Sequence, residues 1–162
     1  MIYTYRRGNI FARAILYMVL AATATVLFLL YPPGAWGLLF LIVVYSYALL
    51  TLSPAFTHHS LTKDWLIIRH GLGVKIEIPL KEIESCGPYT GSHKKLRTGV
   101  YSPWRERTAY VIADPESPVI LDLAEPIKLP ALMWKEVDSI VLDVEQRDIF
   151  LKNLRNGIGS RD

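Results

Sequence analysis

The sequence has no acidic residue before Asp64 and contains a single cysteine, Cys86. One cysteine excludes an intramolecular disulfide framework and is typical of a reducing compartment such as the cytoplasm. From Lys63 onward the chain carries all 15 acidic residues and 15 of its 18 basic residues. The net charge of +3 therefore comes from three arginines near the N-terminus, Arg6, Arg7 and Arg13. This distribution argues against a nucleic-acid-binding domain, so no nucleic-acid partner is expected.

Charge of either sign is also missing from two long apolar runs, residues 14–31 and 35–52. Each run has 18 residues, close to the ~20 that a helix needs to cross ~30 Å of hydrocarbon. The runs are joined by Tyr-Pro-Pro-Gly at residues 31–34, where proline cannot continue a helix and Pro-Gly is typical of a turn. The pattern predicts a transmembrane helical hairpin with spans at about 14–31 and 35–52.

Basic residues precede the first run and follow the second, at Lys63 and Arg69, whereas the turn between the runs has no charge. The positive-inside rule then predicts a multi-pass protein of the cytoplasmic (inner) membrane with both termini in the cytoplasm. A cleaved signal peptide over residues 1–31 is the alternative. The apolar run is longer than a typical signal-peptide core, and no small-residue cleavage site follows it.

Short apolar segments separated by turn residues follow the second run, and they predict strands rather than helices. The clearest is 74–79, in which Val74, Ile76 and Ile78 alternate with polar residues. A final helix is expected to begin near Asp143 and to bury an apolar stripe that includes Phe150 and Leu154. The predicted strands are 56–62, 65–71, 74–79, 83–89, 108–113, 119–123 and 138–144.

This order of elements predicts three parts of the chain. Residues 1–54 form an N-terminal segment and the transmembrane hairpin, residues 55–157 form a cytoplasmic domain, and residues 158–162 form a disordered tail. Seven short strands followed by one amphipathic helix predict a mostly antiparallel β barrel or sandwich, with the helix covering its open end. The predicted fold class is thus an α+β membrane protein.

The segment LTKDWLIIRHGLGVKIEIPLKEIES resembles the opening strands of bacterial pleckstrin-homology-like domains. The similarity rests on Leu61-Thr62, on an apolar strand that ends at Gly71, and on Ile-Pro-Leu-x-x-Ile from Ile78 to Ile83. The alternation at Ile140, Leu142 and Val144 before the last helix is also similar. The resemblance implies a pleckstrin-homology-like barrel, often found after membrane spans, with a scaffold or binding role and no catalytic residues.

The most basic stretch of the chain is SHKKLRTGVYSPWRER, residues 92–107, which also contains two large aromatic residues. We call it the basic loop. A short linker after the second span would hold this loop near the inner leaflet, where basic and aromatic side chains bind anionic headgroups. A protein partner and a solvated loop without a ligand are the alternatives. The candidate lipid- or partner-binding residues are Lys94, Lys95, Arg97, Tyr101, Trp104, Arg105 and Arg107.

No pattern in the sequence predicts a catalytic, cofactor or metal site. His58 and His59 are adjacent in a predicted strand, so their side chains point to opposite faces and cannot easily share one ion; they are expected at headgroup level. Asp114, Glu116, Asp122 and Glu125 are expected to be solvated turn acids. Cys86 is expected to be a small apolar residue of the interior. We therefore expect no enzyme, no cofactor and no metal.

The expected function is a membrane-anchored binding or scaffold module. It would present a pleckstrin-homology-like domain at the inner leaflet to membrane lipids or to a protein partner. The alternative is a structural accessory subunit of a larger membrane complex, assembled through the transmembrane hairpin. The sequence leaves the partner and the oligomeric state open.

Overall fold

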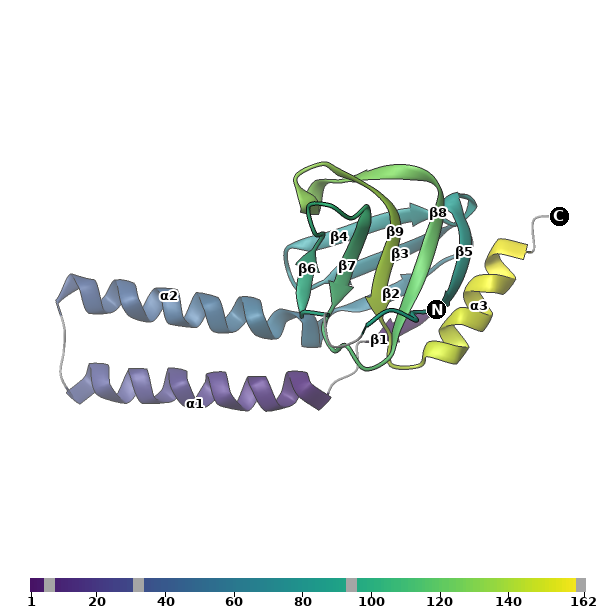
Figure 1. Ribbon diagram of the computed structural model, residues 1–162. Helices are drawn as coiled ribbons and strands as arrows, with labels where there is room; N and C mark the ends of the chain where they lie inside the picture. Colours follow the sequence, from purple (N-terminus) through teal and green to yellow (C-terminus); the bar gives the residue numbers. More distant parts are fainter. Residues whose placement is uncertain (5–7, 31–33, 93–95, 160–162) are drawn as a thin grey trace.

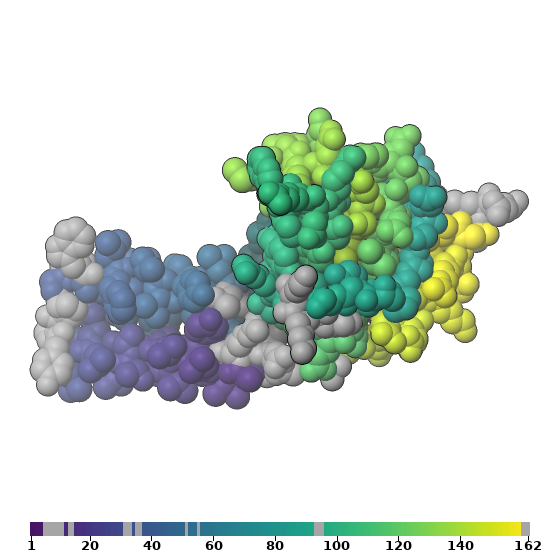
Figure 2. All heavy atoms as spheres, viewed as in Figure 1, coloured from purple at the N-terminus to yellow at the C-terminus, as the bar shows by residue number. Residues whose placement is uncertain are grey.

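The computed structural model describes residues 1–4, 8–30, 34–92 and 96–159. Two helices, α1 (Gly8–Leu30) and α2 (Ala35–Leu52), lie side by side and project from a body of two β-sheets. The C-terminal helix α3 (Arg147–Gly159) packs on the opposite side of that body (Figure 1). Figure 2 shows the same division, with an elongated helical pair joined to a rounded β body.

The predicted transmembrane spans are wrong. Within the described residues, the structure contains no helix that combines the length and the apolar character needed to cross a membrane. The two helices have 23 and 18 residues, and in α1 the uncharged stretch begins only after Arg13. The predicted multi-pass topology in the cytoplasmic membrane, with both termini inside, is unsupported for the same reason.

The first sheet, sheet A, is antiparallel throughout, in the order β1-β2-β3-β4. Its strands are β1 (Ile2–Thr4), β2 (His58–Leu61), β3 (Trp65–His70) and β4 (Val74–Pro79). The alternation predicted for β4 is confirmed, because Ile76 and Ile78 are buried. On the opposite face of the strand, Lys75 and Glu77 are exposed and form an ion pair of 2.5 Å.

The second sheet, sheet B, has the order β5-β8-β9-β7-β6. All pairs are antiparallel except β7 with β9, which is parallel. Strand β8 continues to Leu129, well beyond its predicted end, and forms a long hairpin with β9. The strands are β5 (Ile83–Pro88), β6 (Gly99–Tyr101), β7 (Thr108–Ile112), β8 (Pro118–Leu129) and β9 (Lys135–Asp143).

The predicted closed barrel is wrong, since the strands form two open sheets. The break lies between β4 and β5, which are consecutive in the chain but belong to different sheets. Pro79 ends β4, and the short 3-10 helix Leu80–Glu82 then carries the chain across to sheet B. Consecutive strands therefore do not pair at this point, and the edges at β4 and β5 stay open.

The main core lies between the two sheets. Alternate residues along the strands point into it. Leu66 and Ile68 of sheet A and Leu121, Ile140 and Leu142 of sheet B are completely buried there. The predicted C-terminal helix is confirmed, with Phe150, Leu151 and Leu154 as its buried stripe. Its predicted start near Asp143 is wrong, because Asp143 is the last residue of β9 and α3 begins at Arg147. The helix continues to Gly159, beyond the predicted start of a disordered tail at residue 158; residues 160–162 lie outside the described residues.

Strand β1 was not predicted and closes one end of this core. It pairs with β2, which places Tyr3 opposite His59. The Tyr3 ring meets the Phe150 ring edge to face, with ring centroids 5.0 Å apart, and Asn153 of α3 donates a hydrogen bond of 2.8 Å to the Tyr3 hydroxyl. The first residues of the chain therefore hold α3 against sheet A.

The junction between α2 and sheet A is fixed by one close approach. The Ser53 hydroxyl donates to the Leu50 carbonyl oxygen and accepts the backbone N–H of Leu72, at 2.7 and 3.2 Å. Gly71 adopts φ +62°, and a Cβ atom at that position would lie 2.3 Å from the Ser53 hydroxyl. Glycine alone tolerates the positive φ and has no Cβ to clash with Ser53. The β3–β4 turn can therefore pack directly on the end of α2.

Candidate functional site

Sheet B carries a second apolar cluster on the face turned away from the main core. Strand β7 supplies Tyr110 and Ile112 to this cluster, whereas the alternate residues Ala109 and Val111 belong to the main core. Val141 of β9 is also part of the cluster. Partly buried residues from neighbouring strands and loops pack against it, namely Tyr89, Leu96, Tyr101 and Ile120. Both faces of this sheet are therefore apolar, and among the described residues Tyr89 and Leu96, from the segment between β5 and β6, help to cover the outer face.

A pocket of about 680 Å³ opens on this outer face. We call it the tyrosine pocket, because three of its nine lining residues are tyrosines from separate segments of the chain. One wall follows β5, another belongs to the basic loop and β6, and the floor lies on β7. The lining residues are Tyr89, Ser92, Leu96, Arg97, Tyr101, Ser102, Pro103, Glu106 and Tyr110.

The three tyrosine rings are packed against one another. Tyr101 and Tyr110 occupy paired positions on β6 and β7, and their rings stack with centroids 4.9 Å apart and an interplanar angle of 8°. Tyr89 meets Tyr110 edge to face at 6.5 Å. Cross-strand aromatic pairs of this kind stabilise the sheet and hold the rings in defined positions. These three rings therefore form an aromatic side of the pocket.

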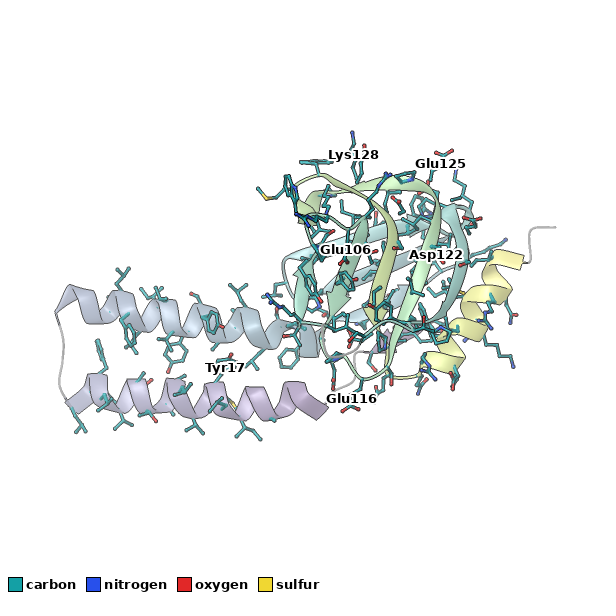
Figure 3. All side chains as sticks on the ribbon, viewed as in Figure 1. Tyr17, Glu106, Glu116, Asp122, Glu125 and Lys128 are labelled. Carbon is teal, nitrogen blue, oxygen red and sulfur yellow. The ribbon has the colours of Figure 1, made fainter. Side chains whose placement is uncertain are left out.

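Polar groups of the pocket are hydrogen-bonded in a way that orients them. The Tyr110 hydroxyl donates to the Glu106 carboxylate at 2.9 Å, and the backbone N–H of Arg97 donates to the Tyr101 hydroxyl at 2.8 Å. Burial, together with the hydrogen bond to Glu106, raises the pKa of Tyr110 above its usual range, so this phenol stays neutral. Figure 3 places Glu106 beside β6 and β7. The site thus combines aromatic surfaces with one oriented carboxylate and one arginine.

The structure separates the predicted site residues into different roles. Arg97 and Tyr101 line the tyrosine pocket, whereas Trp104 is 94% exposed and Arg105 is exposed beside it. Lys94 and Lys95 lie outside the described residues. The connection between β6 and β7, which carries Trp104, lies at the end of sheet B away from α1 and α2 (Figure 1).

Arg107 has a structural role in sheet B. Its guanidinium forms ion pairs with Asp138 at 2.9 Å and with Glu136 at 3.8 Å, both on the adjacent strand β9. Its backbone carbonyl oxygen also accepts the N–H of Asp138 at 2.7 Å. Arg107 therefore anchors the end of the basic loop to β9, and its charge is largely compensated within the chain.

Seven of the nine lining residues were not among the predicted binding residues, including Tyr89, Glu106 and Tyr110. The segment TAYVI (Thr108–Ile112) could have indicated Tyr110, because apolar residues occupy both its odd and its even positions. Such a strand has two buried faces and needs cover on each side. The alternation of Tyr110 and Ile112 with Ala109 and Val111 could thus have indicated a second apolar face.

A second hollow lies between α1 and α2, with a volume of about 810 Å³ and an almost entirely apolar lining. Tyr17 and Tyr47 meet edge to face across it at 5.7 Å, and the Thr25 and Tyr45 hydroxyls hydrogen-bond at 2.5 Å. Tyr17 lies between the two helices in Figure 3. Large apolar side chains on both helices are more than half exposed, including Leu16, Leu29, Leu38, Phe40, Val43 and Leu50.

The two adjacent histidines point to opposite faces of β2, as predicted, but their expected position at headgroup level is wrong. His59 is completely buried, and its Nε2 lies 3.3 Å from the backbone oxygen of Asp143. Burial lowers the pKa of His59 to about 3, so the ring is neutral. Among the described residues, no group of three or more His, Cys, Asp or Glu side chains could hold a metal ion.

The acidic residues near β8 do not form one cluster. Glu116, Asp122 and Glu125 lie at separate heights along β8 and the turn before it (Figure 3). Asp122 accepts a hydrogen bond of 2.6 Å from the Ser85 hydroxyl. Asp114 was expected to be solvated, but it is 1% exposed. Cys86 packs partly buried against the main core, and burial raises the pKa of its thiol.

The tyrosine pocket is therefore a concave site with both aromatic and polar groups on the outer face of sheet B. Comparison of the chain with protein-family models, with curated proteins and with solved structures finds no match. The resemblance to pleckstrin-homology-like domains consequently stays a prediction.

Proposed function

We propose that this protein is a binding module that holds an extended segment of a protein partner in the tyrosine pocket. The observation that carries the proposal is the pocket itself, with three ordered tyrosine rings on the outer face of sheet B. Tyrosine offers a large apolar surface at low conformational cost and is enriched where proteins bind one another. Polar groups at the edge of these rings can pair with a peptide backbone.

The shape of the pocket favours a segment of chain over a broad, flat partner surface. Its walls come from the residues after β5, from the basic loop and from β7, which together enclose a volume suited to a few side chains. Tyr110 is only 8% exposed and forms the floor, whereas Tyr101 stands at the edge. A partner side chain would pack on these rings while its backbone crosses the opening.

Changing Tyr101 to alanine tests the proposal directly. The full chain is used to select binders from a displayed library of random linear peptides, and the affinity of the enriched peptides is then measured. We expect the Tyr101→Ala variant to bind these peptides at least about tenfold more weakly, because it removes one aromatic wall. The matched control is Trp104→Ala, which removes an exposed aromatic residue of the same loop outside the pocket and should leave the affinity unchanged.

Two results would contradict this function. If no peptide is enriched over an unrelated protein, the pocket does not bind extended segments. If Trp104→Ala weakens binding and Tyr101→Ala does not, the tip of the loop binds instead of the pocket.

As a second candidate function, we propose that the protein is a subunit of a larger assembly held together through α1 and α2. The supporting observation is the exposed apolar surface of these helices, with Leu29 73% exposed and Phe40 63% exposed. Monomeric proteins rarely expose a contiguous apolar surface of this extent, so a covering partner is expected.

A charge placed in the hollow between the helices tests this second function. Leu27 lines the hollow and is half exposed, so Leu27→Glu should dissociate the assembly without disturbing the β body. We expect native mass spectrometry of the purified wild-type chain to show a species heavier than one chain, and the variant to show mainly the single chain. A wild-type protein that is monomeric under the same conditions would refute the idea.

A further inference from the structure

We infer that the segment held in the tyrosine pocket is acidic, and that Arg97 binds one of its carboxylates. This inference rests on the proposed function, because it specifies the chemistry of the partner at the same site. It depends on the charges that remain after the ion pairs within the chain have been accounted for.

The charges of the basic loop fall into two classes. Arg107 is compensated by Asp138 and Glu136, and Glu136 also lies 3.4 Å from Lys128. By contrast, within the part of the chain that the structure describes, no carboxylate lies at ion-pair distance from Arg97 or Arg105. Within the described part of the basic loop, the positive charge without an ion pair within the chain therefore lies at Arg97, in the pocket wall, and at Arg105, at the tip of the loop.

Arg97 is held at the pocket wall by its own backbone. Its N–H donates to the Tyr101 hydroxyl at 2.8 Å, so the residue lies against the ring that forms the edge of the site. Arg97 is an exposed residue, and an arginine guanidinium can form two parallel hydrogen bonds to a carboxylate. A partner carboxylate that binds here would stand directly beside the apolar side chain packed on the tyrosines.

The acidic residue of the pocket does not cancel this preference. Among the nine lining residues Glu106 carries the one carboxylate, and it accepts the Tyr110 hydroxyl at 2.9 Å. On the other side, Lys135 donates a hydrogen bond to the Pro103 carbonyl oxygen, which brings a further positive charge to the same rim. Arg97 and Lys135 therefore outnumber Glu106, and an acidic segment is complementary to the rim.

The experiment uses the peptides selected by the full-length chain from the random library. We expect the enriched peptides to contain more Asp and Glu than the starting library, next to an apolar or aromatic residue. Arg97→Gln should weaken binding of an enriched peptide about tenfold, as should replacing its acidic residues with Asn or Gln. When the Arg97→Gln variant meets the peptide without acidic residues, the affinity should fall by less than the product of the two separate fold-changes, because both changes remove the same contact. The control Lys152→Gln removes one exposed positive charge from α3 and should have no effect.

Each alternative outcome is distinguishable. Enriched peptides without an acidic excess, or affinities that do not respond to Arg97→Gln, overturn the inference but leave the proposed function standing. Failure to enrich any peptide overturns both. Vesicles of phosphatidylcholine with and without phosphatidylglycerol are tested in parallel. If only the anionic vesicles bind, and Arg97→Gln abolishes this binding while the peptides are unaffected, the rim recognises lipid headgroups and the inference is wrong.

Discussion

Replacing Phe150 with alanine is expected to lower the free energy of unfolding by about 3–5 kcal/mol, the largest loss that a single substitution in this chain should cause. The ring is completely buried, and it lies where α3, β1 and the main core meet. Alanine would leave a cavity there, because the surrounding side chains come from three elements that cannot all move inward. Chemical denaturation followed by circular dichroism measures the loss.

The neighbouring residue provides the control. Ile149 is 53% exposed on the same helix, so Ile149→Ala should change the free energy of unfolding by well under about 1 kcal/mol. A double-mutant cycle with Tyr3→Ala should then give a coupling of about 0.5–1.5 kcal/mol, as expected for an edge-to-face aromatic pair. Equal effects at positions 149 and 150, or no coupling to Tyr3, would show that α3 is not packed on the core in this way.

Most of the strands could be predicted because alternation of apolar and polar residues is a local property of the chain. It located β4 closely, whereas β7 was located by a short apolar run between turn residues and the buried stripe of α3 by the helical period. Strands β1 and β6 have three residues each, too few for any period to be recognised. Each exists because a longer neighbour, β2 or β7, supplies its hydrogen bonds, and that pairing is not visible in the sequence.

The two larger errors also have physical causes. The barrel was wrong because alternation shows which face of a strand is buried but not which strand lies beside it. At Leu80–Glu82 the chain leaves one sheet for the other. The transmembrane spans were wrong because the absence of charge from a run of residues does not by itself define a membrane-spanning helix. Among the described residues, no helix combines the length and the apolar character that crossing requires.

The sequence predicted the position of the candidate site in the chain better than it predicted what each of its residues does. The basic loop does border the tyrosine pocket, but Arg107 is paired with acids on β9, some thirty positions further along the chain. The exposed Trp104 stands apart from the aromatic wall, which is built from Tyr89, Tyr101 and Tyr110. Only the folded chain brings these three tyrosines together, since they belong to different strands or their flanks.

Replacing Asp143 with alanine is expected to lower the free energy of unfolding by about 2–4 kcal/mol. The buried carboxylate accepts the backbone N–H groups of Ala113 and Asp114 at 2.8 and 3.0 Å, and it thereby joins the end of β7 to the end of β9. Alanine would leave two buried donors without their acceptor, each costing about 1–3 kcal/mol, and the loss of a buried charge offsets part of that cost. The exposed Asp148 at the start of α3 offers a control, because Asp148→Ala should be nearly neutral.

The same residue should give the stability a distinctive dependence on pH. Burial raises the pKa of Asp143 from 3.8 to about 7, so at intermediate pH the native state holds a proton that the unfolded state has lost. The stability that this proton contributes is complete below the unfolded pKa and is lost as the pH rises through about 7, by at most about 1.4 kcal/mol per pH unit. Burial also lowers the pKa of His59 to about 3 and that of His70 to about 4, and both groups act in the opposite direction at acidic pH.

Comparison with Asp143→Asn isolates the carboxyl group, because the two histidines titrate in both proteins and cancel in the difference. The stability of the wild type relative to this variant should fall between about pH 5 and pH 7 and become constant above about pH 8. A difference that stays constant from about pH 5 to pH 8 would mean that Asp143 is ionised throughout. In that case the two hydrogen bonds from Ala113 and Asp114 would outweigh the cost of burying the charge, and Asp143 would act as a permanently charged clamp between β7 and β9.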